Sequence, residues 1–192
     1  MPRVDNKKFY KSAINIHGTS PKGVNWNSKK SQNIRFKMIL QMLPQNLKDS
    51  TVVDAGCGFG DFYTYALKHH KEFTYIGIDS LSDMYSIASE KTGCEILIAD
   101  ICIDAVPDAT YYICSGAMNV LKRFETHLFI RKCFEASKKG FVFNILHGNK
   151  KSKTYNYFTK QDIQSIANDL GVKKVIFVDG YLDADITVGF FK

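Results

Sequence analysis

The chain has 192 residues, of which 45% are hydrophobic and 23% are charged. This length is typical of one domain and this composition of a globular protein, which excludes wholesale disorder. The five cysteines are odd in number and include no CxxC pair, so we expect neither a disulfide framework nor a zinc knuckle, and we expect a reduced cytoplasmic location. No apolar run approaches the ~18 residues of a membrane span, and the polar start does not resemble a secretory signal.

The net charge of +7 is concentrated at the start of the chain. Residues 1–50 carry ten Lys and Arg against two Asp and Glu. Such a segment could contact a phosphate backbone, which keeps RNA among the candidate partners. Lysines greatly outnumber arginines, however, and phosphate recognition favours the arginine fork, so a solvated basic surface is the preferred interpretation.

Taken in chain order, the predicted elements of the first two thirds alternate between helix and strand after an N-terminal helix. They are a Ser-capped helix over Ser31–Leu43 that stops at Pro44, a strand over Thr51–Ala55, a glycine-rich turn, a helix over Asp61–His70, a strand over Phe73–Asp79, a helix over Leu81–Lys91 closed by Gly93, and strands over Cys94–Ala99 and Thr110–Ser115.

The last third continues the alternation. It has a helix from about Phe124 to Lys138 stopped by Gly140, a strand over Gly140–Leu146, a polar loop over His147–Phe158 that is a candidate lid, a helix capped by Thr159 with Asp162 and ended by Gly171, a strand over Lys174–Val178, and a final strand with Ile186, Val188 and Phe190 on one face. The order predicts an α/β fold with a mainly parallel sheet in a single domain, 1–192, with residues 1–47 as a helical cap or substrate segment and 48–192 as the core.

The segment VVDAGCGFGD at 52–61 places three glycines in a strand-to-helix turn. Glycines there allow the backbone to approach a ligand closely and direct the amides of a helix N-terminus toward it. The next strand ends at Asp79, where a carboxylate is placed for the two hydroxyls of an adenosine ribose, and Asp100 ends the third strand. Three strand ends therefore converge on one predicted nucleotide crevice.

The type of nucleotide follows from the charges beside the loop. A dinucleotide motif would require Gly or Ala where Asp61 stands, and no GxxxxGKS/T motif is present. Carboxylates at Asp54 and Asp61 would repel a pyrophosphate but suit a positively charged sulfonium nucleoside.

With these motifs the sequence resembles the class I S-adenosylmethionine (SAM)-dependent methyltransferases from about residue 48 to its end. The resemblance is carried by the DAGCGFG loop, the YIGIDSLSDMYSIASEK unit, the residues Ile98 to Ile101, and the YYICSGAMNVL strand. The whole chain, including WNSKKSQNIRFKMIL, is also similar to small bacterial methyltransferase-like proteins of unassigned substrate. The resemblance implies a Rossmann-like fold: a seven-stranded, mostly parallel sheet with helices on both faces and an antiparallel last strand beside the fifth.

The resemblance also implies a cofactor site for SAM, with no metal. Its expected residues are Asp54 and the backbone of Gly56, Cys57, Gly58, Phe59 and Gly60 for the methionine part, Asp79 for the ribose, Ser80 and Met84 beside the adenine, Asp100 and Ile101 at the adenine edge, and Ser115 near the transferred methyl group. Arg35 could pair with the methionine carboxylate or remain a solvated charge.

The fourth strand ends Cys114-Ser115-Gly116-Ala117 and departs from the Asn/Asp-Pro-Pro-Tyr/Phe motif of amino-methylating DNA and glutamine methyltransferases. Cys114 is interpreted as a buried apolar residue, because the Pro-Cys loop of a cytosine-C5 enzyme is absent. The acceptor pocket could instead be lined by residues of the N-terminal segment and of the end of the fifth strand with the loop after it: Trp26, Gln32, Asn144, His147, Tyr155, Tyr157 and Phe158. The alternative, that those of the fifth strand and its loop are ordinary edge and loop residues, is the preferred interpretation.

The expected activity is methyl transfer from SAM to an unidentified acceptor by direct displacement. No catalytic residue is assigned, although His147 is the nearby group that titrates near neutral pH. Two alternatives remain: a SAM-binding sensor or partner protein without catalysis, because this fold hosts many functions, and an RNA-directed methyltransferase.

Overall fold

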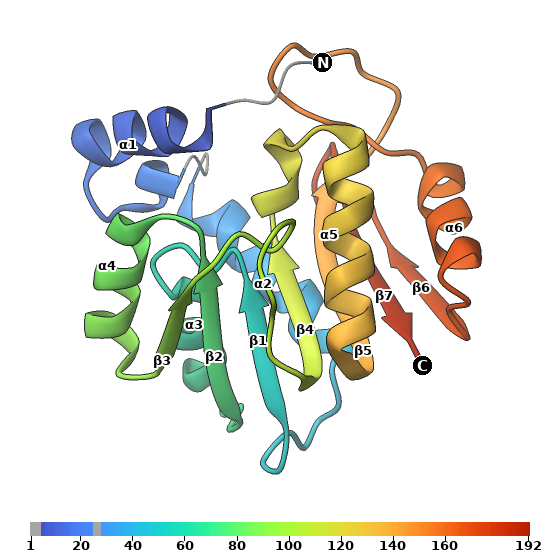
Figure 1. The fold of residues 1–192 in the computed structure, drawn as a ribbon, viewed down its shortest axis with the longest axis horizontal. Coiled ribbons are helices and arrows are strands. Elements are labelled where there is room, and N and C mark those ends of the chain that lie inside the picture. Colours follow the sequence, from blue (N-terminus) through green and yellow to red (C-terminus); the bar gives the residue numbers. More distant parts are fainter. Residues whose placement is uncertain (1–4, 25–27) are drawn as a thin grey trace.

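The computed structural model describes residues 5–24 and 28–192, so Trp26 lies outside the described residues. Seven strands are interspersed with helices along the chain (Figure 1). The elements are α1 (Asn6–His17), η1 (Pro21–Val24), α2 (Lys29–Met42), β1 (Thr51–Ala55), α3 (Asp61–Lys68), β2 (Thr74–Asp79), α4 (Ser82–Thr92), β3 (Glu95–Ile98), β4 (Ala109–Ser115), η2 (Ala117–Val120), α5 (Arg123–Ala136), β5 (Ser137–Leu146), α6 (Lys160–Asp169), β6 (Lys174–Val178) and β7 (Asp185–Phe191).

The strands form one sheet in the order β3-β2-β1-β4-β5-β7-β6. The first five strands pair in parallel, and β7 is antiparallel to both of its neighbours, β5 and β6. The predicted mainly parallel sheet with an antiparallel last strand beside the fifth is confirmed. The order reverses between β1 and β4, and a ligand of an open α/β sheet binds at such a switch point, outside the carboxyl ends of the strands.

Helices cover both faces of the sheet. Apolar residues of α2, α3 and α4 share a core with one face, and those of α5 and α6 share a core with the other. The central strands β4 and β5 are buried on both sides, as in Tyr111–Cys114 and Phe141–Ile145. Near-continuous apolar runs of this kind are typical of parallel strands covered on two faces. Cys114 is fully buried among them, as the sequence indicated.

The N-terminal region differs in detail from the sequence prediction. Helix α2 is capped by the hydroxyl of Ser28, which accepts the backbone N–H of Ser31 at 3.1 Å, so the helix begins earlier than Ser31. Helix α1 was not predicted. It is capped by Asp5, whose carboxylate accepts the N–H of Lys8 at 3.0 Å, and it lies beyond the carboxyl ends of β1, β2 and β3 (Figure 1).

Gly140 does not stop a helix. Strand β5 begins at Ser137, directly after α5, and Gly140 lies within it, paired with Phe191. A Cβ at Gly140 would come within 2.6 Å of the carbonyl oxygen of Phe190. The glycine therefore permits the close approach of β7, a long-range reason that local sequence does not contain. By contrast, Gly93 caps α4 in the left-handed conformation and Thr159 forms the capping box of α6, both as predicted.

Candidate functional site

The glycine loop joins β1 to α3 at the switch point of the sheet. Gly56, Gly58 and Gly60 all have positive φ, at 78°, 53° and 70°. A Cβ at Gly56 would lie 2.3 Å from the Cβ of Ala117, so a side chain there would collide with the turn that follows β4. The loop therefore has the tight conformation that the sequence predicted, which lets the backbone approach a ligand closely. Its N–H groups are largely used within the protein: those of Gly56 and Cys57 donate to the carbonyl oxygen of Ile78 at 2.8 and 3.0 Å, and that of Gly60 donates to the carbonyl oxygen of Cys57 at 3.0 Å.

Asp79, the last residue of β2, is held in place by two backbone amides. Its Oδ2 accepts the N–H of Gly58 at 3.0 Å, and its Oδ1 accepts the N–H of Leu81 at 3.1 Å. Burial raises the pKa of this carboxyl to about 6, although the hydrogen bonds from Gly58 and Leu81 act in the opposite direction. The backbone amide of Ser80 also donates to this carboxylate and acts in the same direction as these hydrogen bonds.

Asp54 lies on β1, below the glycine loop, and is almost fully buried. Burial raises its pKa to about 7, and the hydrogen bond from the hydroxyl of Tyr75, 3.0 Å from Oδ2, lowers it only in part. Two carboxyl groups of raised pKa thus flank the same loop. Burying a carboxyl group without a cationic partner costs free energy, so such groups cluster at functional sites.

Asp61 is an anion beside the loop, as expected, but neighbouring lysines compensate its charge. Its carboxylate pairs with Lys91 at 2.5 Å and Lys29 at 3.3 Å, and accepts a hydrogen bond from Gln32 at 3.1 Å. Burial acts to raise its pKa, but the contacts with Lys91 and Lys29 lower it overall. The electrostatic argument against a pyrophosphate therefore rests on Asp54 and Asp79.

A cavity of about 140 Å³ opens at the carboxyl ends of the strands. A water needs only about 10–15 Å³ on this scale, so the space suits a small organic molecule. Of the expected cofactor residues, Gly60 and Arg35 do not line it. Those that do are Asp54, Gly56, Cys57, Gly58, Phe59, Asp79, Ser80, Met84, Asp100, Ile101 and Ser115.

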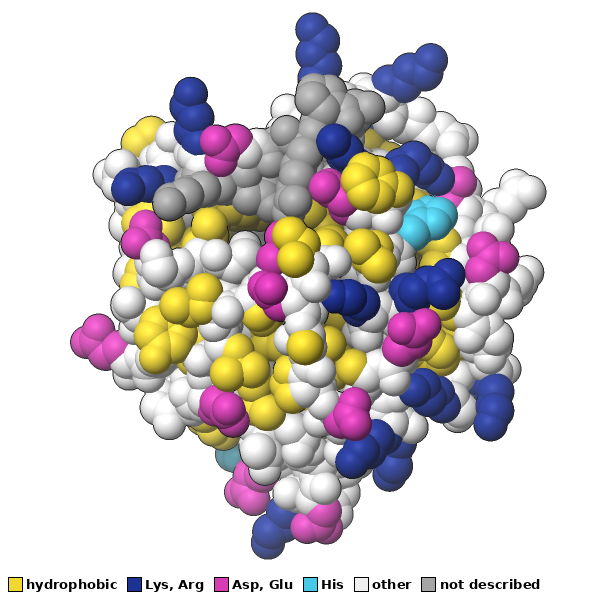
Figure 2. All heavy atoms as spheres, viewed as in Figure 1, with side chains coloured by type: hydrophobic (Ala, Val, Ile, Leu, Met, Phe, Trp, Pro, Cys, Tyr) yellow, Lys and Arg dark blue, Asp and Glu magenta, His cyan; other side chains and the backbone are white. Residues whose placement is uncertain are grey.

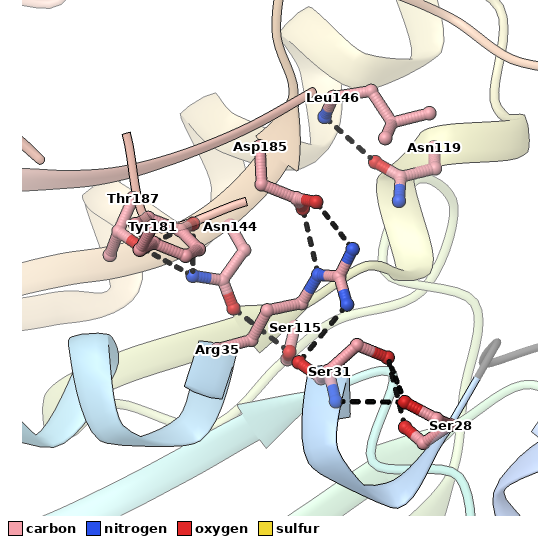
Figure 3. A network of polar contacts seen from close by, with 10 residues as sticks. All are labelled: Ser28, Ser31, Arg35, Ser115, Asn119, Asn144, Leu146, Tyr181, Asp185 and Thr187. Atoms are coloured by element: carbon pink, nitrogen blue, oxygen red, sulfur yellow. Dashed lines mark hydrogen bonds and ion pairs between the residues drawn. The ribbon is translucent and has the colours of Figure 1, made fainter. Parts of the chain in front are cut away.

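Arg35 is buried, and its guanidinium faces Asp185 on β7 (Figure 3). The contact is bidentate: Nε lies 2.7 Å from Oδ1, and Nη2 pairs with Oδ2. Nη1 also donates to the carbonyl oxygen of Ser31 at 3.1 Å. The residue is therefore not a solvated charge; in this structure it joins α2 to β7.

Of the residues named for an acceptor pocket, Gln32 and Tyr155 line the cavity, whereas Asn144, His147, Tyr157 and Phe158 do not. Phe158 is fully buried, and its carbonyl oxygen lies 2.9 Å from the Nδ1 atom of His147. Asn144 is buried behind Ser115, whose hydroxyl donates to its Oδ1 at 2.9 Å (Figure 3).

Helix α1 also contributes to the cavity, which was not predicted from the sequence. Phe9 and Tyr10 line the cavity, and burial, followed by the nearby Asp79, raises the pKa of Tyr10 well above its usual value. The hydrophobic pattern and the Asp5 cap could have indicated this helix. Asn119 and Val120 of η2 also line the cavity, but a short 3₁₀ turn leaves little trace in a sequence.

Among residues 5–24 and 28–192, no group of three or more His, Cys, Asp or Glu side chains could hold a metal ion. In the same part of the chain, no helix combines the length and the apolar character that crossing a bilayer requires.

The sequence matches no protein-family model and no curated relative. Solved structures do match. One is the magnesium protoporphyrin IX methyltransferase of Synechocystis PCC 6803, crystallised with S-adenosylhomocysteine (SAH). It has a TM-score of 0.71 at 14% identity, and the match covers 97% of this chain and 95% of that protein. A putative methyltransferase of Haloferax volcanii, in complex with the Trm112 methyltransferase activator, has a TM-score of 0.72 at 15% identity over 98% and 97%. A SAM-dependent methyltransferase of Aquifex aeolicus has a TM-score of 0.64 at 16% identity over 86% and 94%. At these identities the likeness shows the fold: this chain has the fold of the class I SAM-dependent methyltransferases.

Proposed function

We propose that this chain is a SAM-dependent methyltransferase that binds its cofactor in the cavity at the ends of β1, β2 and β4. The observation that carries the proposal is the placement of Asp79, whose carboxylate is fixed by the N–H groups of Gly58 and Leu81 at the cavity wall. A carboxylate fixed at the end of the second strand is placed to accept hydrogen bonds from the hydroxyls of a ribose.

The charges of the cavity support a cationic ligand. Asp54 and Asp79 both line it, and no Lys or Arg side chain is among the described residues that do so. SAM carries positive charge and no phosphate, so its binding would offset the cost of burying these carboxylates. A nucleotide with a pyrophosphate would face repulsion in the same place.

The cofactor residues proposed from the sequence are retained with two changes. Asp54 and the backbone of 56–59 would bind the methionine part. Gly60 would act indirectly, as the N-cap residue of α3, where it adopts the left-handed conformation. Asp79 would bind the ribose. Ser80, Met84, Asp100 and Ile101 would surround the adenine, and Ser115 would lie near the methyl group. Arg35 is left out, because its guanidinium is engaged by Asp185.

Bound SAM supplies a methyl group on a sulfonium, which an acceptor lone pair can displace directly. The chain's own contribution is then to position the two reactants and to exclude water. Tyr10 and Tyr155 cover the cavity from α1 and from the loop after β5. His147 does not line the cavity, so no general base is assigned to it; one is required only when the acceptor must lose a proton.

A labelled-methyl experiment tests this function. The protein is incubated with methyl-labelled SAM and fractions of metabolites or RNA from cell extract, with Asp79→Ala as the matched inactive control. Transfer of label by the wild type alone supports the enzyme. Binding of SAM without transfer to any fraction would favour a sensor or partner protein.

The same experiment separates a small-molecule acceptor from RNA. Acidic side chains lie among the Lys and Arg side chains on the face in Figure 2, so that face has no purely basic stripe. A small-molecule acceptor is therefore preferred. Transfer of label to RNA, with RNA binding that weakens steeply as the salt concentration rises, would instead favour an RNA acceptor.

A further inference from the structure

The turn after β4 presents a hydrogen-bond donor to the cavity that the cofactor assignment does not use. Asn119 lies in η2 and lines the cavity. Its Oδ1 accepts the backbone N–H of Leu146 at 3.1 Å, where β5 leaves the sheet. A backbone N–H can only donate, so the amide can have only one orientation: oxygen toward Leu146 and Nδ2 away from it.

Figure 3 shows this orientation, with the amide nitrogen of Asn119 turned away from Leu146. Among the described residues, no hydrogen bond from Nδ2 is found, and Nδ2 is not one of the buried side-chain atoms without a partner, so it is accessible. The backbone is fixed as well, because the carbonyl oxygen of Asn119 accepts the N–H of Asn156 at 2.7 Å. Two distant segments thus hold the amide in one position, which is the preorganisation that a recognition group needs.

Aromatic side chains line the same cavity as this donor. Phe9 and Tyr10 enter from α1, and Tyr155 enters from the loop whose backbone Asn119 holds. Flat side chains of this kind pack well against an aromatic ring. Ser115 stands at the start of the same turn, and its own proton is donated to Asn144 at 2.9 Å, so Asn119 is the side-chain donor that this turn offers.

Resting on the function proposed above, we infer that Asn119 is a specificity-determining residue that donates a hydrogen bond to an oxygen of a small aromatic methyl acceptor. An acceptor with a carbonyl, carboxylate or phenolate oxygen would satisfy Nδ2. A purely hydrocarbon acceptor would leave the amide unpaired and would bind more weakly.

The test uses two probes that differ only at the oxygen, acetophenone and ethylbenzene, titrated into the wild-type protein with and without saturating SAH. Asn119→Asp keeps an oxygen for Leu146 and removes the donor, and Asn119→Ala removes the donor without adding charge. Asn149→Ala is the control, because Asn149 is exposed in the loop that covers the cavity.

The wild type and Asn149→Ala are expected to bind acetophenone roughly fivefold more tightly than ethylbenzene, as one neutral hydrogen bond allows. Both Asn119 variants should lose this preference while their affinity for SAH stays unchanged. Equal binding of the two probes by the wild type, binding of neither, or an unchanged preference in both Asn119 variants would overturn the inference. Failure of SAH to bind the wild type would instead overturn the proposed function, and the SAH-free titrations keep the two results apart.

Discussion

At the scale of single residues, Asp79 is the best-defined polar group of the cavity, because both of its oxygens are fixed by backbone amides. Asp79→Ala removes a charged hydrogen-bond acceptor and should weaken SAM binding by roughly 1.5–3 kcal/mol, or about 10- to 150-fold. Calorimetric titration measures this. Asp83→Ala is the control, since Asp83 is an exposed acid on the following helix; an equal loss in both variants would remove Asp79 from the site.

Gly58 has a φ of 53°, and a Cβ there would lie 3.3 Å from the Cγ1 atom of Val24, which also lines the cavity. Gly58→Val should therefore abolish SAM binding, because the β-branched side chain both strains the turn and crowds the cavity wall. Thermal melts with and without SAM measure the loss. Gly171→Val carries similar strain at φ 64° in open space, so it should melt lower and still respond to SAM. A full SAM response in Gly58→Val would make the glycine turn purely structural.

The carboxyl groups of Asp54 and Asp79, with pKa values raised to about 7 and about 6 by burial, predict a pH dependence. A cationic ligand favours their ionised form, so the affinity for SAM should rise, by roughly tenfold, between pH 5.5 and 7.5. The ligand-free protein should show the opposite trend: folding favours the protonated groups, so their contribution to stability is lost as the pH rises from about 4 to about 7. Calorimetric titration across this pH range measures the affinity for SAM, and thermal melts measure the stability of the ligand-free protein, with Asp54→Asn for comparison. A flat affinity profile would contradict the assignment.

At the scale of elements, the ion pair between Arg35 and Asp185 ties the cap helix α2 to β7. Both side chains are buried, so Arg35→Met leaves an unpaired buried carboxylate and should destabilise the fold by about 3–5 kcal/mol. Urea unfolding measures this, and adding Asp185→Asn should restore part of the loss. The affinity of the folded variant for SAM should change little, because Arg35 does not line the cavity. A selective loss of SAM affinity would instead return Arg35 to the cofactor site.

The elements also show what the sequence could predict. The strands, the glycine turn and the capping box of α6 follow from local rules of periodicity and turn chemistry, and they were placed nearly correctly. The partner of Arg35 lies 150 residues away in the sequence. The need for glycine at position 140 comes from the approach of Phe190. Neither feature could be predicted from the local sequence. The ion pairs of Asp61 likewise depend on Lys29 and Lys91 from two other helices.

At the scale of the whole molecule, the topology brings the ends of β1, β2 and β4 to one place and covers them with α1 and the loop after β5. Sequence spacing predicted that the glycine turn, Asp79 and Ser115 meet at one cavity, because they lie at the ends of β1, β2 and β4. The opposite wall could not be predicted in this way. It is assembled from α1, η2 and Tyr155, whose proximity arises only once the sheet has formed.

The central claim is that this cavity binds SAM through its buried carboxylates and glycine turn. The most direct measurement is a thermal melt of the wild-type protein at pH 7.5 with SAM at increasing concentration. At 100 times the dissociation constant, linkage predicts about 2.7 kcal/mol of stabilisation, or an increase in Tm of roughly 5–10 °C, which Asp79→Ala and Gly58→Val should reduce or abolish. No increase in the wild type at millimolar SAM, or an equal increase in both variants, would contradict the claim.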